Sequence, residues 1–102
     1  MKIVLFYIPF GTAEDANAIG LSAIEHKLAA CANVFPIQSM YAWNGTMQND
    51  HEVVLLLKTI PEKIMALNKF LKDKHPYEVP CILHWEVEVN EEYGEWIKSI
   101  VN

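Results

Sequence analysis

Residues 41–45, Tyr-Ala-Trp-Asn-Gly, decide the fold, because they place a tight turn between two long apolar segments. Asn44 and Gly45 are the residue types that most readily adopt the positive φ angles of a type I′ turn, which joins paired antiparallel strands. The segment from Cys31 to Trp43 before the turn is rich in strand-forming side chains, and residues 53–57, Val-Val-Leu-Leu-Leu, follow it. A strand that is apolar on both faces lies inside a sheet, so the sequence predicts a long hairpin whose second strand is central.

A helix is predicted on each side of the hairpin. Residues 3–8 form an apolar run typical of a buried first strand. Residues 12–15, Thr-Ala-Glu-Asp, follow as a capping box, in which the first side chain accepts from the third helical amide and the last reaches back. This start and the apolar spacing predict a helix over residues 12–29. A second capping box, residues 59–62, begins a helix whose buried face is formed by Ile64, Leu67, Phe70 and Leu71.

The chain after the second helix completes the sheet. Residues 81–89 alternate apolar and polar side chains as a final strand, and Asn90 is placed to cap a last amphipathic helix. Two helix crossovers and one hairpin predict a ferredoxin-like βαββαβ sandwich of the α/β class, with an extended hairpin and an additional C-terminal helix. In this topology the first and third strands are central. The second strand, which contains Pro36, and the fourth are edges. We expect residues 1–102 to form a single domain.

The hairpin is longer than the helices that cover the sheet. A helix of about 18 residues is ~27 Å long at 1.5 Å per residue, whereas a strand over residues 32–43 is ~40 Å long at 3.3 Å per residue. The difference is an overhang of ~13 Å, and it carries Met40, Tyr41, Trp43 and Met47. Apolar side chains on exposed edge strands promote aggregation, so we expect another subunit to cover them. The alternative is an exposed hairpin tip without consequence.

Composition excludes several classes of partner. The chain of 102 residues contains eight Lys and no Arg, and its net charge is −5, so neither nucleic acid nor an anionic membrane is an expected partner. No apolar run approaches the roughly 18 residues of a membrane span. Cys31 and Cys81 are too few for a disulfide framework, and we expect two buried thiols in a cytoplasmic protein.

Five short motifs together resemble the CutA family. They are residues 28–33 (Leu-Ala-Ala-Cys-Ala-Asn), the turn at residues 41–45, Lys58-Thr59, residues 75–78 (His-Pro-Tyr-Glu) followed by Pro80, and Tyr93 with Trp96. The resemblance implies a ferredoxin-like protomer, a homotrimer joined through extended strands, and an architecture akin to the PII signalling proteins. It also implies a role in divalent-cation tolerance, that is, a response to copper and similar ions, and no established reaction.

His75 is the residue with the strongest metal-binding chemistry. Its imidazole suits Cu²⁺ or Zn²⁺, Glu78 lies close in sequence, and Cys31 offers a soft sulfur ligand. We therefore name His75, Glu78 and Cys31 as candidate metal ligands. The alternative is that His75 orders the turn around Pro76 by hydrogen bonds and that Cys31 and Cys81 are packed thiols.

Resemblance to bacterial members of the family implies a copper site formed by a Cys after the first strand and two adjacent His before the Pro-Tyr pair. The matching positions here are Ile8, Lys74 and His75, so one of the three ligands is present. This difference argues against that arrangement in this chain. A divalent ion, Cu²⁺ or Zn²⁺, is the only cofactor that the sequence brings into consideration.

Aromatic and charged residues also indicate a pocket between subunits. We expect Tyr41, Trp43, Lys58, Tyr77 and Trp96 to line it, because ligand pockets combine apolar walls with a few polar groups. Aromatic packing at an interface, without any ligand, is the alternative.

Several functions remain open at this point. Nucleophilic catalysis receives no support, since no Ser lies in an elbow motif and no Gly-rich phosphate loop is present. We expect a protein that is not an enzyme, and an enzyme that uses a general acid–base pair is the alternative. The leading hypothesis is a trimeric divalent-cation tolerance protein that binds or responds to metal ions such as copper. The alternatives are a structural or scaffolding trimer, and a small-ligand-sensing trimer of the PII type without a metal site of its own.

Overall fold

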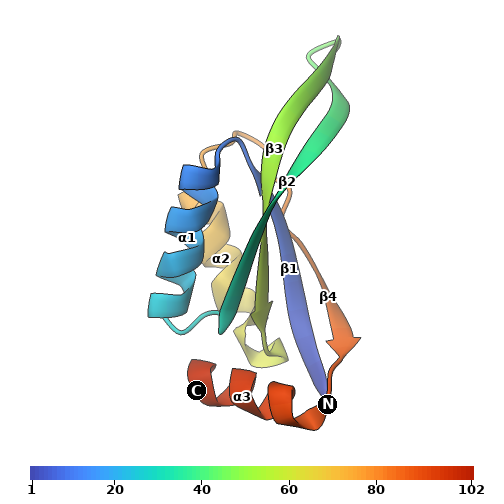
Figure 1. Ribbon diagram of the computed structural model, residues 1–102. Coiled ribbons are helices and arrows are strands. Elements are labelled where there is room, and N and C mark those ends of the chain that lie inside the picture. Colours follow the sequence, from blue (N-terminus) through green and yellow to red (C-terminus); the bar gives the residue numbers. More distant parts are fainter.

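Figure 1 shows the computed structural model of residues 1–102, in which four strands form one antiparallel sheet. The strands are β1 (Lys2–Phe10), β2 (Cys31–Trp43), β3 (Thr46–Thr59) and β4 (Leu83–Glu88). The helices are α1 (Ala13–Glu25), the short 3-10 helix η1 (Pro61–Lys63), α2 (Ile64–Lys74) and α3 (Glu91–Val101). The order across the sheet is β2-β3-β1-β4, so the predicted ferredoxin-like topology is confirmed, with β1 and β3 central and β2 and β4 at the edges.

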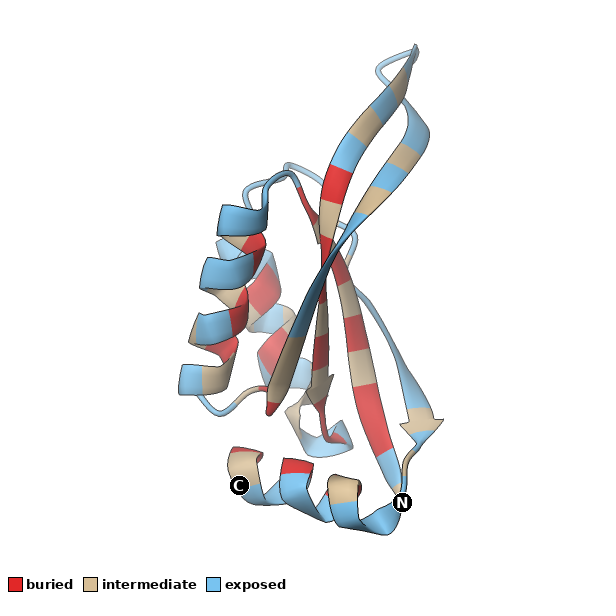
Figure 2. Cartoon of the chain, in the orientation of Figure 1, coloured by how far each residue is buried: buried red, intermediate tan, exposed pale blue.

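Helices α1 and α2 cover one face of the sheet and enclose the main core (Figure 1). Alternate residues of a strand point to opposite faces, and one set of β1 residues is fully buried against the helices (Figure 2). Burial of such side chains is the main favourable contribution to folding, at about 25 cal/mol per Å² of apolar surface. The buried residues of this cluster include Val4, Phe6, Ile8 and Phe10 of β1, Leu55 and Leu57 of β3, Ala16 and Ala23 of α1, and Leu67 and Leu71 of α2.

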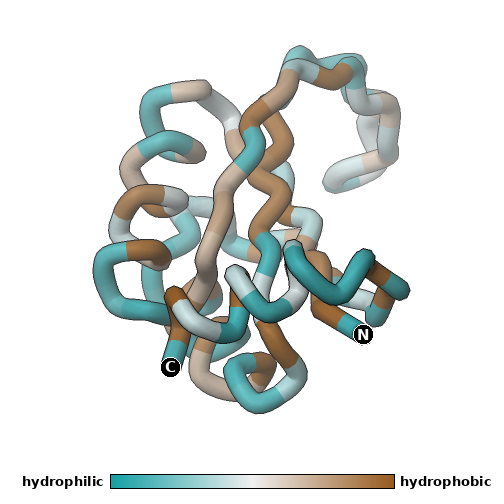
Figure 3. Tube along the Cα trace, turned by 60° about the horizontal axis from the view of Figure 1, so that its bottom comes forward, coloured by the Kyte–Doolittle hydropathy of each residue, from teal (hydrophilic) through white to brown (hydrophobic).

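The opposite face of the sheet has no helix over its middle. Hydrophobic residues run along the strands in the centre of the molecule (Figure 3), and those that alternate with the core residues point to this uncovered side. Phe35, Leu83 and Trp85 are 38%, 44% and 42% exposed. We call this surface the open face and define it by Leu5, Tyr7, Phe35, Leu56, Leu83 and Trp85.

Helix α3 closes the end of the sheet farthest from the hairpin, where both chain termini lie (Figure 1). Ile97 and Val101 of this helix are fully buried, and they form a second, smaller cluster with Ile3, Ala30 and Ile60. The additional C-terminal helix was predicted, and its apolar stripe is what holds it against the sheet.

The hairpin of β2 and β3 extends well beyond the helical layer, at the top of Figure 1. Asn44 has φ of 51° and Gly45 has φ of 77°, as expected of the predicted type I′ turn. None of residues 31–51 is buried, and Met40 and Met47 near the tip are 73% and 76% exposed (Figure 2). The predicted apolar overhang is therefore present, and the longest dimension of the chain is 46 Å.

Only one of the three predicted helix caps forms a hydrogen bond. Oγ1 of Thr12 accepts a bond of 3.1 Å from the amide of Asp15, although the Asp15 side chain does not return one. The capping box predicted at Thr59 is wrong, because this residue ends β3 and its hydroxyl donates to the carbonyl of Leu28 at 2.8 Å. Asn90 precedes α3 as predicted, but its side chain makes no capping bond.

Helix α1 is shorter than predicted. It ends at Glu25 rather than at residue 29, because Lys27 adopts a left-handed φ of 58°. The amides of Leu28 and Ala29 then both donate to the carbonyl of Ala23, which closes the helix. Glycine is the usual residue in such a turn, so a lysine gives no sequence signal for it.

The segment between α2 and β4 is irregular, and β4 is accordingly shorter than the predicted strand over residues 81–89. Cys81 lies in this segment and is exposed, while Cys31 at the start of β2 is half-buried, and both thiols are free. The expectation of two buried thiols is wrong, because neither residue faces the core between sheet and helices.

Candidate functional site

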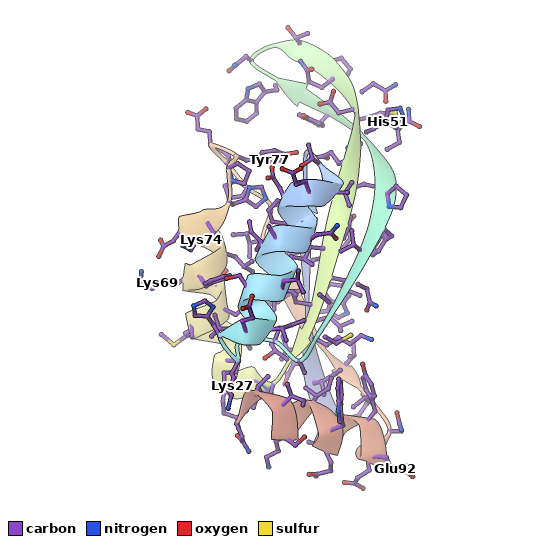
Figure 4. All side chains as sticks on the ribbon, turned by 60° about the vertical axis from the view of Figure 1, so that its left-hand side comes forward. Lys27, His51, Lys69, Lys74, Tyr77 and Glu92 are labelled. Atoms are coloured by element: carbon purple, nitrogen blue, oxygen red, sulfur yellow. The ribbon has the colours of Figure 1, made fainter.

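A cavity of about 500 Å³ lies where the hairpin leaves the body of the sheet. The hairpin supplies one wall, and the irregular segment between α2 and β4 supplies the other. Figure 4 shows Tyr77 in this place, between the end of α2 and the overhanging hairpin. Small-molecule sites are typically about 300–1,000 Å³ in volume, so the cavity is large enough for a small ligand. Its lining residues are Pro9, Tyr41, Trp43, Glu52, Tyr77, Glu78, Val79 and Cys81.

Glu52 is the one buried carboxylate of the chain, at 9% exposed. Its Oε2 accepts a hydrogen bond of 2.7 Å from the hydroxyl of Tyr77. Burial, and then this bond and the charge of Glu52, raise the pKa of Tyr77 well above its ordinary value. The phenol therefore stays protonated, and Tyr77 remains the donor in this pair.

Two further groups show the negative character of the cavity. The hydroxyl of Tyr41 donates to Oδ2 of Asp50 at 2.6 Å, and this bond is the main cause that raises the pKa of Tyr41. The pKa of the Cys81 thiol is also raised, first by partial burial and then by the charge of Glu52. A thiol that is kept protonated is a poor nucleophile and a poor metal ligand.

His75 is held in one neutral form. Its Nε2 lies 2.8 Å from the carbonyl oxygen of Pro9, which only accepts, so Nε2 carries the proton. Its Nδ1 accepts from the amide of Tyr77 at 3.1 Å, and the ring stacks on Phe10 with 4.2 Å between centroids. Burial lowers the pKa of His75, although the bond to Pro9 opposes the shift. This geometry agrees with the predicted alternative, in which His75 orders the turn around Pro76.

The three candidate metal ligands do not converge. Cys31 pairs with Lys58 toward one end of the sheet, whereas His75 lies beside Pro9 at the hairpin end of β1. Glu78 is exposed and lines the cavity, without a hydrogen bond to the other two. No group of three or more His, Cys, Asp or Glu side chains is placed to hold a metal ion.

The five predicted pocket residues fall into two groups. Tyr41, Trp43 and Tyr77 line the cavity. Lys58 and Trp96 lie instead toward α3, where Nζ of Lys58 donates to the hydroxyl of Tyr93 at 3.2 Å and the rings of Tyr93 and Trp96 are 5.6 Å apart. Lys58 therefore does not contribute a charge to the cavity.

The sequence interpretation missed Glu52 and Asp50. Both lie on the β3 strand, and their side chains share one face because they are two positions apart. The available signal was an acidic residue directly before the apolar run at residues 53–57, since a carboxylate there lies close to the core. The open face was also missed, because a run that is apolar on both faces indicates that both are covered within the chain.

The family model of the CutA1 divalent ion tolerance protein matches residues 4–100. The chain belongs to this family. The divalent-cation tolerance protein CutA of Thermotoga maritima is 39% identical over 97% of this chain and 99% of its own length. The Protein CutA homolog of Xenopus laevis is 41% identical over 84% of this chain but 58% of its own length. The chain thus spans a little more than half of that vertebrate CutA relative.

Solved structures of the CutA family share the whole fold. The CutA1 crystal structure from Ehrlichia chaffeensis has a TM-score of 0.94 at 31% identity and covers 98% of this chain and 95% of its own. The structure from Archaeoglobus fulgidus, described as a periplasmic divalent cation tolerance protein, has a TM-score of 0.93 at 34% identity and covers 98% and 99%. Within this CutA1 chain, no helix has the length and apolar character needed to cross a membrane.

Proposed function

We propose that the chain is a divalent-cation tolerance protein that binds or responds to metal ions such as copper, acts as a homotrimer and catalyses no reaction. Family membership over residues 4–100 supports the role, and the Thermotoga relative carries it in its name. A cell that lacks the gene is expected to grow less well than its parent in copper or zinc salts, and equally well in potassium chloride. Equal growth in all three media would contradict the role.

The open face is the observation that carries the homotrimer. Its exposed aromatic and aliphatic side chains form an apolar surface of the kind that marks a protein interface. The outer edges of β2 and β4 are also unpaired within the chain, and an unpaired edge is open to pairing with another strand. A trimer that pairs these strand edges and packs the open faces together covers both the apolar surface and the unpaired edges. Light scattering at micromolar concentration should give three times the 11.7 kDa chain mass, and a monomer mass would refute the proposal.

Direct metal binding is the testable part of the cation role. His75 with Glu78 is the candidate pair, and a metal ion at Nδ1 of His75 has to displace the amide of Tyr77. Calorimetry with Cu²⁺ and Zn²⁺ should show binding that is lost in His75→Ala and kept in His51→Ala, whose imidazole is exposed. Equal binding by both variants would remove His75 from the site. Absence of binding by the unaltered protein would show that it responds to metal ions without coordinating them itself.

The cavity favours a second candidate function, the sensing of a small ligand by the assembly. It combines three aromatic side chains with two carboxylates, which is the usual composition of a specific ligand site. A ligand that binds the folded protein raises its melting temperature by mass action. A thermal-shift series with and without candidate ligands therefore tests this function separately from metal tolerance.

We propose a cytoplasmic location. Two free thiols support it, because structural disulfides are typical of oxidising compartments and free cysteines of reducing ones. The Archaeoglobus relative is described as periplasmic, so fractionation is the deciding measurement. Recovery of the protein with cytoplasmic markers is expected, and recovery with periplasmic markers would overturn the assignment.

A further inference from the structure

We propose that the cavity at the base of the hairpin binds a small aliphatic ammonium ion, a monoamine or short diamine in its protonated form. This inference deepens the small-ligand function and does not depend on the divalent-cation role. Three properties of the cavity carry it: the charge of its surroundings, the state of Glu52, and the aromatic side chains of its walls.

The lining of the cavity contains two carboxylates and no lysine. Glu52 and Glu78 line it, and Asp50 is tied to the lining residue Tyr41. The imidazole of His75 next to Tyr77 is neutral, since one of its nitrogens donates and the other accepts. Charges in a partly enclosed site interact more strongly than in bulk water, so the cavity favours a cation and disfavours an anion.

The two ion pairs of the chain lie away from the cavity. They join the N-terminal ammonium group to Glu88, and Lys69 to Asp73 on α2. None of the three carboxylates at the cavity belongs to either pair. Their charge is therefore available to a ligand.

Glu52 presents one oxygen that is free to accept. Its side chain is nine-tenths buried, and Oε2 is engaged by Tyr77, whereas Oε1 accepts no hydrogen bond within the chain. Every fully buried polar side-chain atom of the chain has a hydrogen-bond partner. Oε1 has none, so it is not fully buried, and it is accessible from the cavity that Glu52 lines. A carboxylate oxygen that is otherwise surrounded by protein binds a charged N–H donor more strongly than a neutral one.

The walls of the cavity suit the alkyl part and the charge of an amine. Tyr41, Trp43 and Tyr77 are all lining residues, and the negative face of an aromatic ring attracts an ammonium group. Val79 and Pro9 add aliphatic surface for methylene groups. A hydrated metal ion makes no use of such walls, and no three carboxylates or imidazoles converge on a point.

Three ligands of equal chain length separate charge from shape. Protonated butylamine, 1-butanol and butyrate are added to the purified assembly, and binding is followed by calorimetry and by the melting temperature in a buffer of constant ionic strength. Of these three, only butylammonium is expected to bind and to raise the melting temperature. Putrescine, the diamine of the same chain length, should bind at least as well. Absence of amine binding, or equal effects of butanol or butyrate, would overturn the proposal.

Variants locate the binding in the cavity. Glu52→Gln removes the charge but keeps an acceptor for Tyr77, and Glu78→Gln removes the second carboxylate that lines the cavity. Each should weaken amine binding by about tenfold. Glu92→Gln removes one carboxylate from α3, at the opposite end of the molecule from Tyr77 (Figure 4), and should leave amine affinity unchanged. Equal weakening in Glu92→Gln would show that net charge, and not the cavity, attracts the amine. Equal growth of the gene-deleted cell and its parent in copper or zinc salts, with amine binding intact, would refute the divalent-cation role alone.

Discussion

The hydroxyl of Tyr77 donates a hydrogen bond of 2.7 Å to Oε2 of Glu52 across 25 positions of the chain. It is the only side-chain hydrogen bond that joins the segment after α2 to the hairpin strands. Because Glu52 is nearly buried, the same bond also compensates for part of the water that its carboxylate loses on folding. One contact thus joins the two walls of the cavity and compensates for the burial of a charge.

Replacing Tyr77 by Phe should lower the free energy of unfolding by about 1–3 kcal/mol, since a charged acceptor is left with one partner fewer in a buried place. Urea unfolding of the assembly at fixed protein concentration measures the change. Tyr7→Phe is the matched control. The hydroxyl of Tyr7 makes no hydrogen bond within the chain, so its removal should change the free energy of unfolding little. Equal losses in the two variants would show that the bond to Glu52 contributes nothing.

Replacing Thr59 by Val should cost about 1–2 kcal/mol of unfolding free energy. The residue is fully buried, and its Oγ1 donates to the carbonyl of Leu28 at 2.8 Å, so valine keeps the shape and leaves that carbonyl unpaired. Thr46→Val in the exposed hairpin should change stability by less than about 0.5 kcal/mol. A loss at Thr46 as large as at Thr59 would contradict this account.

The order and pairing of the elements followed from local chemistry. The Asn44-Gly45 pair fixes a type I′ turn by itself, and Thr12 caps a helix with the amide three residues on. Once the hairpin register and two crossovers are known, few sheet topologies remain, and the observed order β2-β3-β1-β4 is one of them. These features depend on residues that are neighbours in sequence.

The cavity as a whole could not be predicted, because its residues come together through long-range contacts that the sequence periodicity does not indicate. Glu52 precedes an apolar run, and its burial and its bond to Tyr77 arise because the segment after α2 turns back across β1. Lys58, which was predicted in a pocket between subunits, donates within the chain to Tyr93 near α3, and no local sequence signal indicates that contact. Long-range proximity had to be observed.

A charge on the open face should break the proposed trimer. Trp85→Glu places a carboxylate where the side chain is 42% exposed in the single chain and is expected to be covered by another subunit. A charge that is buried without a partner is costly, so light scattering should show a smaller mass than for the unaltered protein. Met65→Glu adds the same charge to the outer side of α2, where the side chain is 86% exposed, and should leave the mass unchanged. An unchanged mass in Trp85→Glu would exclude this face from the interface.

Stability should fall in acid through His75. Burial lowers the pKa of His75 below its ordinary value of 6.5, so the unfolded chain binds the proton more readily than the folded one. Well above pH 6.5, His75 is neutral in both states and does not make the free energy of unfolding depend on pH. As the pH drops from 6.5 toward the lower pKa of His75 in the folded protein, its protonation in the unfolded chain reduces the free energy of unfolding. His75→Gln keeps an N–H donor for the carbonyl of Pro9 but does not titrate, and should flatten that part of the profile, whereas His51→Gln at an exposed site should retain it. A profile that is equally steep in His75→Gln would assign the acid sensitivity to another group.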